Sequence, residues 1–332
     1  MVHLSSLALI QSFAEKQRLD HINWLKQGLV SSLKEDEFLA IDIGGSYRLM
    51  PYPESSPRLF RGQNADFGVC LPTIYRNSPP LVKRILDMAK INELKQALES
   101  IGGYKEQLKI LGLKFSVDYE ALAQHYGLAS RYIDFTSNPL VAGFFATSKF
   151  DVERSKYLPI AGSGIGVFYE VNRAAEIARS NEFEIIGLQP FQRPAQQYAF
   201  GLKCPKKGLV AKYGVMQYKF LHSKDSYIIF DMLNGGLHLF PDDPVFSVVS
   251  KIKATNYISL SSLEWAVEQL QVRNTTRQIK WLTLLGVTVG VDHASYVTQD
   301  ERISIQSAWC KQKETFSSKV KIRRVASHLT IS

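Results

Sequence analysis

The sequence predicts an α+β or α/β fold, because segments with the spacing of strands alternate along the chain with segments that have the spacing of helices. Apolar side chains recur on one side of residues 80–98, as in a helix, and residues 166–171 alternate as in a strand. Neither an internal repeat nor a low-complexity linker interrupts this pattern.

The first predicted element is helical. Apolar residues at helical spacings in residues 5–39 predict one or two helices that lead into the rest of the chain. These residues are Leu9, Phe13, Ile22, Leu25, Leu29 and Leu33. Gly44 and Gly45 end the pattern, and residues 58–62 are expected to form a short strand.

The central block, residues 124–146, combines polar groups with strongly apolar neighbours. A helix is predicted for residues 117–125, with Gly127 placed to end it. A short strand is predicted for residues 132–135, and Pro139 is placed to begin a helix that continues through residue 146. Polar groups in such surroundings are either locally satisfied or used for binding, so a site is sought here.

The later part of the chain continues as strands and helices. Strands are predicted for residues 166–171, 196–202 and 215–221, and a helix for residues 262–270 with Ser261 or Ser262 as its cap. Residues 227–233 fit either a strand or a helix, because periodicity does not decide over so short an apolar run.

Length and composition limit the class of protein. The chain has 332 residues, of which 45% are hydrophobic, so it can bury a sizeable core in one large domain with appendages or in two domains. The three cysteines are far apart without a CxxC pair, which argues against a disulfide framework and a zinc site. Charged residues closely follow the apolar run 4–10, and no basic segment precedes it. We therefore expect neither a secretion signal nor a membrane span, and a cytoplasmic location.

The net charge of +9 raises the question of nucleic-acid binding, because clustered Lys and Arg gain affinity for phosphates by releasing counterions. The densest stretch, residues 311–324, ends with the alternation of a half-buried strand with one basic face. A second patch consists of Lys203, Lys206 and Lys207. We interpret both as solvated surfaces, because no known nucleic-acid module is visible.

Arg61 is the first candidate binding residue. It lies at the end of a predicted strand and is followed by Gly62 and Gln63. The missing side chain of a glycine lets a ligand approach the backbone, while a guanidinium group grips a phosphate or a diol. An Arg61 paired with a carboxylate for structural reasons is an equal alternative on this fragment.

Thr136, Ser137 and Asn138 form the second candidate group, between a strand and a helix. Asn138 before Pro139 is the natural helix cap, and the N-terminus of a helix is also a place where anions bind.

His125, Tyr126 and Asp134 are the remaining candidates. A single histidine at the end of an apolar helix is more often a hydrogen-bonded core residue than a catalyst. Asp134 lies in an apolar strand and needs a partner, for which Arg131 and Arg61 are available.

Four motifs in order resemble the FRG domain, which is named after its Phe-Arg-Gly triplet. They are FRG at residues 60–62, QHYG at 124–127, DFTSNPLVA at 134–142 and AQQ at 195–197. LFPD at 239–242 matches a further element of that family and favours a helix for residues 227–233. The sequence departs from the family pattern at Ala129, Ser130, Phe135 and Tyr198. The resemblance implies a helical lead-in at 1–45, an FRG domain at 46–253, and an extension at 254–332 with a helix and a basic strand.

The FRG pattern is similar to that of ADP-ribosyltransferases of the Arg-Ser-Glu type. This implies an α+β fold, with a mixed, split β-sheet flanked by helices and a C-terminal α/β extension. The resemblance implies that NAD phosphates or ribose are held by Arg61, with Gly62, Gln63, His125 and Tyr126 around them. Thr136, Ser137 and Asn138 would brace the nicotinamide side.

In the same resemblance, Gln196 and Gln197 fall near the position of the catalytic acid. A glutamine can hold the ribose 2′-hydroxyl but supplies no negative charge for the oxocarbenium-like transition state. Asp134 and Glu184 are the acids that we consider as substitutes.

Three functions remain open. The first is an NAD-consuming enzyme without a metal, an ADP-ribosyltransferase or NAD glycohydrolase in a defence, toxin or phage context, whose macromolecular acceptor is unknown. The second is a non-catalytic module that binds NAD or ADP-ribose, which the glutamine at the acid position favours. The third is a nucleic-acid or protein interaction domain that uses the basic C-terminal face. We rank the enzyme slightly above the binding module and both above nucleic-acid binding.

Overall fold

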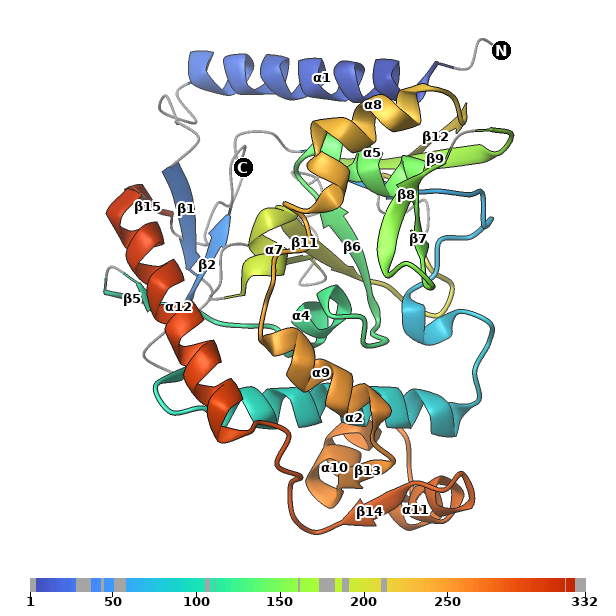
Figure 1. Cartoon of the computed structure of the whole chain (residues 1–332), viewed down its shortest axis with the longest axis vertical. Coiled ribbons are helices and arrows are strands. Elements are labelled where there is room, and N and C mark those ends of the chain that lie inside the picture. The colour runs from blue at the N-terminus through green and yellow to red at the C-terminus, as the bar shows by residue number, and fades with distance from the viewer. Residues whose placement is uncertain are drawn as a thin grey trace.

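The computed structural model describes residues 4–27, 37–42, 45–50, 58–104, 108–110, 112–160, 162–172, 183–186, 191–209, 214–319 and 321–325. These residues form an α+β architecture, in which helices surround a central sheet (Figure 1).

The central sheet has six strands in the order β10-β11-β6-β3-β9-β12. The strands are β3 (Arg58–Gln63), β6 (Tyr132–Thr136), β9 (Ile165–Asn172), β10 (Phe183–Ile185), β11 (Ala199–Lys203) and β12 (Met216–Leu221). All neighbouring pairs in this sheet are antiparallel. The α+β prediction is therefore confirmed, whereas the prediction of a mixed sheet is wrong for this sheet.

Two halves of the sheet meet at β3 and β6 through one residue pair, Phe60 with Thr136. By contrast, β3 pairs with β9 along its whole length, and β6 does the same with β11. The two central strands therefore diverge from a single point of contact, and this divergence positions the candidate site.

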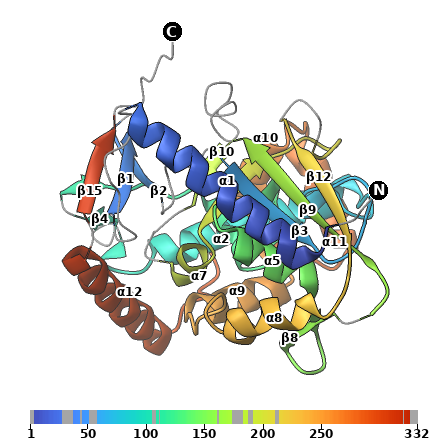
Figure 2. The ribbon, with the colours of Figure 1, turned by 90° about the horizontal axis from the view of Figure 1, so that it is seen from above.

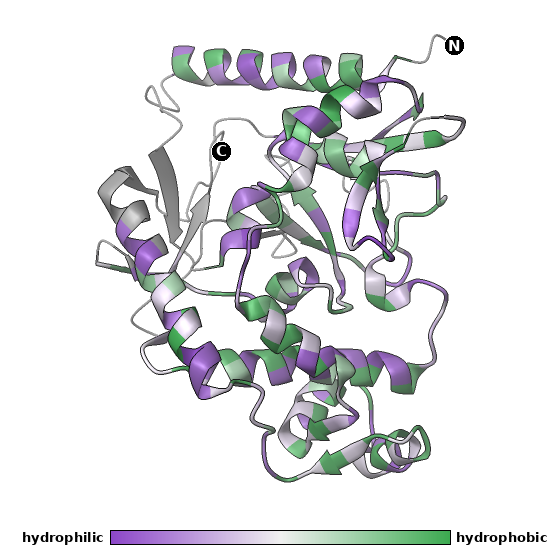
Figure 3. Ribbon diagram, viewed as in Figure 1, coloured by the Kyte–Doolittle hydropathy of each residue, from purple (hydrophilic) through white to green (hydrophobic). Residues whose placement is uncertain are grey.

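Three helices cover one face of the sheet. They are α1 (Ser6–Lys26), α5 (Pro139–Thr147) and α8 (Asp225–Met232). Helix α1 passes across the strands (Figure 2), and the ring centroid of Phe13 lies 4.9 Å from that of Phe60 on β3. Hydrophilic and hydrophobic residues both occur along α1 (Figure 3), and its buried apolar side chains include Leu9, Ile10 and Phe13.

The opposite face of the sheet carries a second apolar cluster. Leu59, Ile133 and Phe200 contribute from the strands, and Cys70 and Cys204 contribute from the segments that cover them. Both of these cysteines are buried, and neither belongs to a disulfide.

A helical layer encloses a further core. Its helices are α2 (Leu81–Glu99), α4 (Tyr119–His125), α9 (Val245–Ala254), α10 (Leu260–Gln269), α11 (Thr275–Leu284) and α12 (Gln299–Lys319). Leu94 of α2 and Val249 of α9 share this core with Leu263, Leu282 and Trp309. Residues on both sides of the expected boundary at residue 253 thus pack together, and the domain boundaries remain predictions.

Short elements complete the described structure. They are the helices η1 (Thr73–Tyr75), α7 (Gln192–Gln196) and η3 (Asn234–Gly236), and the strands β1 (Glu37–Asp42), β2 (Tyr47–Met50), β4 (Lys109–Ile110), β5 (Leu113–Lys114), β7 (Ser148–Asp151), β8 (Lys156–Pro159), β13 (Tyr257–Ser259), β14 (Thr288–Gly290) and β15 (Lys321–Val325). Strand β1 pairs with β15 in parallel and with β2 in antiparallel orientation.

Most of the predicted helices and strands are confirmed, including the helix over residues 227–233. The lead-in is a helix only to Lys26, with a strand from Glu37, while Leu29, Leu33 and Gly44 lie outside the described residues.

Several boundaries differ from the prediction. The strand expected at 196–202 begins at Ala199, because α7 precedes it and Tyr198 turns the chain with a φ of 47°. Ser259, rather than Ser261 or Ser262, caps α10 through its hydroxyl oxygen. Residues 311–319 belong to α12, and the basic strand starts only at Lys321. Within the described residues, no helix combines the length and apolar character needed to cross a membrane.

Candidate functional site

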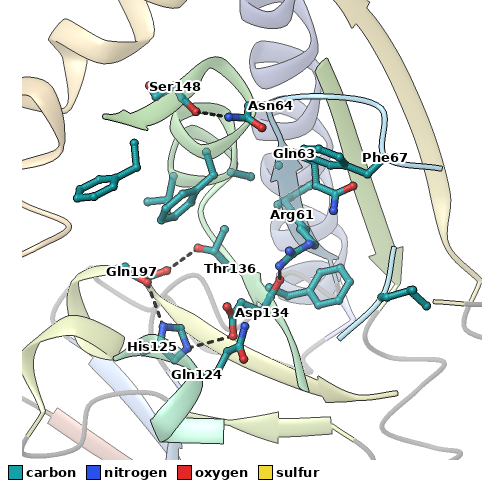
Figure 4. Close-up of a pocket in the computed structure, with 18 of the residues that line it drawn as sticks. Arg61, Gln63, Asn64, Phe67, Gln124, His125, Asp134, Thr136, Ser148 and Gln197 are labelled. Atoms are coloured by element: carbon teal, nitrogen blue, oxygen red, sulfur yellow. Dashed lines mark hydrogen bonds and ion pairs between the residues drawn. The ribbon is translucent and has the colours of Figure 1, made fainter. Parts of the chain in front are cut away.

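A pocket of about 730 Å³ opens where β3 and β6 diverge (Figure 4). Its walls come from these two strands, from α5, from the β7–β8 hairpin, and from residues 64–77. The volume lies within the range of roughly 300–1,000 Å³ that is typical of small-molecule sites. The divided sheet therefore provides a cavity large enough for a nucleotide.

Arg61 bridges the two diverging strands. Its Nη1 donates to the main-chain oxygen of Asp134 at 2.8 Å. Its Nε is buried without a hydrogen-bond partner, and Arg61 forms no ion pair with any residue that the structure describes. Arg61 also lines the pocket. Its remaining donors are therefore free to bind an anion there.

Gly62 serves the packing of α5 against β3. A Cβ atom at this position would lie 1.9 Å from the main-chain oxygen of Ala142 and 2.6 Å from the nitrogen of Ala146. Gly62 lines the pocket, but α5 already occupies the space of its missing side chain, so the reason expected for this glycine is corrected. The neighbouring Gln63 lines the pocket, but its Oε1 accepts a hydrogen bond from Tyr169 at 2.9 Å.

His125 connects Gln197 with Asp134 at the base of the pocket (Figure 4). Its Nδ1 lies 3.0 Å from Oε1 of Gln197, and its Nε2 lies 3.6 Å from Oδ1 of Asp134. The side chain of His125 is 3% exposed, whereas that of Asp134 is 31% exposed. The expected partners of Asp134 were Arg131 and Arg61. Its carboxylate faces His125 instead, and Arg131 pairs with Glu120 at 2.7 Å.

Gln197 is held at both ends of its amide. Oε1 faces His125, and Nε2 donates to the main-chain oxygen of Leu239 at 3.0 Å. Gln197 follows the last residue of α7, and it is buried. Its amide therefore orients His125. The carboxylate of Asp134 lines the pocket.

Thr136 and Asn138 hold the backbone at the end of β6. Thr136 Oγ1 donates to the main-chain oxygen of Gln197 at 2.7 Å and accepts a hydrogen bond from the nitrogen of Asn138. Asn138 Oδ1 accepts from the nitrogens of Leu140 and Val141, which confirms it as the cap of α5.

Ser137, Tyr126 and Gln196 do not line the pocket. Ser137 is buried, and its main-chain oxygen accepts a hydrogen bond from Gln17 of α1 at 2.7 Å. Tyr126 is buried and donates to Asp243, and burial together with the Asp243 charge raises the pKa of the Tyr126 phenol. Gln196 is exposed. The side chain of Glu184, on β10, lies outside the described residues.

Arg76 is a pocket residue that the sequence did not reveal. It follows η1, lines the pocket together with Arg61, and donates from Nε to the main-chain oxygen of Leu71 at 3.1 Å. The stretch Asn77-Ser78-Pro79-Pro80 after it indicates a turn, but a turn pattern does not show where the preceding side chain points.

Aromatic side chains form another unpredicted part of the pocket. Phe67 is 65% exposed and Phe150 is 45% exposed, although both are large and apolar. Phe150 packs edge-on against Tyr157 with ring centroids 5.2 Å apart, and Phe145 lines the same wall. Isolated aromatics in loops and hairpins leave no periodic signal in a sequence, so their convergence depends on the tertiary fold.

A comparison with protein families finds a match for part of the chain that lines the pocket. Residues 56–155 match the FRG domain. The match to the FRG domain includes Arg61, His125 and Asp134, and it ends before Gln197. No curated protein and no solved structure matches the chain.

The described residues contain no group of three or more histidine, cysteine, aspartate or glutamate side chains that is placed to hold a metal ion. The side chains that line the pocket include two arginines, one carboxylate and an aromatic wall.

Proposed function

We propose that the pocket binds NAD and that the protein cleaves the bond between nicotinamide and ribose, as an ADP-ribosyltransferase or an NAD glycohydrolase. One observation carries this proposal: Arg61, which has unused donors, and the partly exposed carboxylate of Asp134 line the same pocket. The divergence of β3 and β6 supports the similarity to the ADP-ribosyltransferase fold.

Asp134 takes the part of the carboxylate in this proposal. Cleavage of the nicotinamide–ribose bond builds positive charge on the ribose, and a nearby carboxylate stabilises that charge. His125 lies beside the Asp134 carboxylate: its buried ring is fixed by Gln197, and its Nε2 is 3.6 Å from Oδ1. Gln197 itself acts as a positioning residue.

The aromatic wall suits the planar parts of the substrate. Phe145, Phe150 and Tyr157 line the pocket on the side of α5 and the β7–β8 hairpin. Aromatic faces bind flat heterocycles by offset stacking, so this wall is the proposed place for a nicotinamide or adenine ring. Arg61 then contacts the phosphates or a ribose.

A non-catalytic NAD or ADP-ribose binding module is the second candidate. The observation that favours it is the amide at position 197, whose two polar ends are both engaged by protein groups. In that case the pocket retains nucleotides without cleaving them, and Asp134 serves to bind ribose hydroxyl groups.

Incubation of the full-length protein with NAD separates these candidates. Release of nicotinamide, measured by liquid chromatography with and without cell lysate as a source of acceptors, is expected from the wild-type protein. Asp134→Asn should release far less nicotinamide, and Asp300→Asn, which removes an exposed carboxylate on α12, is its control with the same charge change. Saturable NAD binding without any nicotinamide release would reject the enzyme and leave the binding module.

A further inference from the structure

Arg76 is the charged group of the pocket that the proposed function does not yet use. It lines the cavity together with Arg61, and neither side chain forms an ion pair with another described residue. Partial desolvation and the positive charge of Arg61 lower the pKa of the Arg76 guanidinium, while Asp134 acts in the opposite direction. The two guanidinium groups therefore repel each other, and an anion between them would remove that repulsion.

The backbone after Arg76 has an unusual conformation. Asn77 has a φ of 59° and Ser78 a φ of 47°, so two successive non-glycine residues adopt the left-handed region. Such conformations are uncommon, and they gather at sites where the fold must hold a side chain in one place. Asn77 also lines the pocket. This turn fixes the backbone next to Arg76, and the hydrogen bond from Arg76 Nε to the main-chain oxygen of Leu71 fixes its guanidinium group.

We propose that Arg76 acts with Arg61 as a second guanidinium contact, and that the pocket selects ligands with two adjacent phosphates. This inference rests on the nucleotide pocket proposed above and narrows its ligands to those with a diphosphate, such as NAD, ADP-ribose and ADP. Guanidinium groups bind phosphates through paired, charge-assisted hydrogen bonds. Two guanidinium groups suit a diphosphate, whereas a monophosphate would leave one guanidinium group without a bound phosphate.

Isothermal titration calorimetry with the full-length protein tests the proposal. The probes are ADP against AMP, and inorganic pyrophosphate against inorganic phosphate, so that the nucleoside and the diphosphate contribute separately. We expect the wild-type protein to bind ADP at least about tenfold more tightly than AMP, and pyrophosphate more tightly than phosphate.

Arg76→Ala is expected to weaken ADP binding by about tenfold or more, and AMP binding by less than about threefold. Arg76→Lys keeps the charge but not the paired donors, so it should restore only part of the lost affinity. Arg277→Ala is the matched control, because it removes an exposed positive charge from α11 and should change neither affinity. The side chain of Arg76 is exposed, so we expect each variant to fold, which circular dichroism checks.

Equal binding of ADP and AMP by the wild-type protein, equal losses for both in Arg76→Ala, or no binding of any probe would overturn the inference. The proposed function is tested separately. Selectivity for diphosphates that depends on Arg76, without cleavage of NAD, would support the inference and reject the enzymatic function. Cleavage of NAD with unchanged ADP affinity in Arg76→Ala would support the enzymatic function and reject the inference.

Discussion

The buried imidazole of His125 lies with its Nε2 3.6 Å from Oδ1 of Asp134. The opposite nitrogen of His125, Nδ1, faces Oε1 of Gln197. The orientation of the Gln197 amide is set by its own Nε2, which donates to the main-chain oxygen of Leu239. We therefore assign the hydrogen to Nδ1 in the neutral ring, because an amide oxygen needs a donor. The imidazole beside the Asp134 carboxylate is thus oriented by the amide of Gln197.

Asp134→Asn tests the chemical role of this carboxylate. The variant keeps the size and hydrogen-bonding capacity of the side chain but removes the negative charge. Because that charge is proposed to stabilise the transition state, nicotinamide release should fall by about 10²–10³-fold while NAD affinity stays within about threefold. Steady-state kinetics and calorimetry measure the two effects. Unchanged turnover would show that Asp134 is not the catalytic carboxylate.

Gln197→Glu tests whether Gln197, which the sequence resemblance placed near a catalytic acid, is structural. At neutral pH the new carboxylate would place an acceptor against the main-chain oxygen of Leu239, where Gln197 now donates at 3.0 Å. The free energy of unfolding should fall by about 1–3 kcal/mol. The loss should shrink as the pH approaches the ordinary glutamate pKa of about 4.3, because a protonated carboxyl again supplies a donor.

Urea denaturation at two pH values measures the effect of Gln197→Glu, and nicotinamide release should not rise. Gln196→Glu is the matched control, because the neighbouring side chain is exposed. A variant at position 197 that is both stable and faster would instead show that this position is open to catalysis.

The sequence predicted the elements around the pocket well, because their signals are local. Asn138 before Pro139 specifies a capped helix, and the apolar periodicity of residues 80–98 specifies α2. The resemblance to ADP-ribosyltransferases implied a mixed central sheet, and periodicity could not correct this because it does not reveal how strands pair. The direction of the Arg76 side chain and the contact between His125 and Asp134 likewise depend on residues far apart in the chain, and no local pattern contains them.

Gly62→Ala tests the corrected role of this glycine. Its Cβ would lie 1.9 Å from the main-chain oxygen of Ala142, and a helix backbone cannot move away as a flexible side chain can. We expect a loss of about 3 kcal/mol or more, at or above the upper end for overpacked cores. Gly102→Ala is the control, because the nearest atom there is 3.5 Å away, on the Gln306 side chain. Normal stability with weak ligand binding in Gly62→Ala would contradict the packing role and show that a ligand approaches the backbone at Gly62.

Glu170 links α1 to the sheet, and acid should weaken this link. Burial alone would raise the pKa of its carboxyl, but hydrogen bonds from Lys16, Tyr218 and Arg58 outweigh burial and lower it from 4.5. Because the folded pKa lies below the unfolded one, the stabilisation is fully present above about pH 4.5 and is lost as the pH falls through the folded pKa.

Thermal unfolding from pH 7 to pH 3 measures this dependence on Glu170. Glu170→Gln should be less stable at neutral pH by about 3–5 kcal/mol, because it breaks a buried ion pair, and its melting temperature should fall less steeply in acid. Glu15→Gln is the control, since its pair with Arg18 is exposed and worth little. Parallel acid profiles for wild-type protein and Glu170→Gln would contradict the assignment.

The central claim is that Arg61 and Asp134 belong to one NAD site. The most direct test is a crystal structure of Asp134→Asn soaked with NAD, because this variant is expected to bind the dinucleotide and cleave it slowly. The account predicts the diphosphate beside Arg61 and the nicotinamide ribose within hydrogen-bonding distance of position 134. NAD bound outside the pocket, or absent from it at concentrations that saturate the variant in solution, would contradict the account.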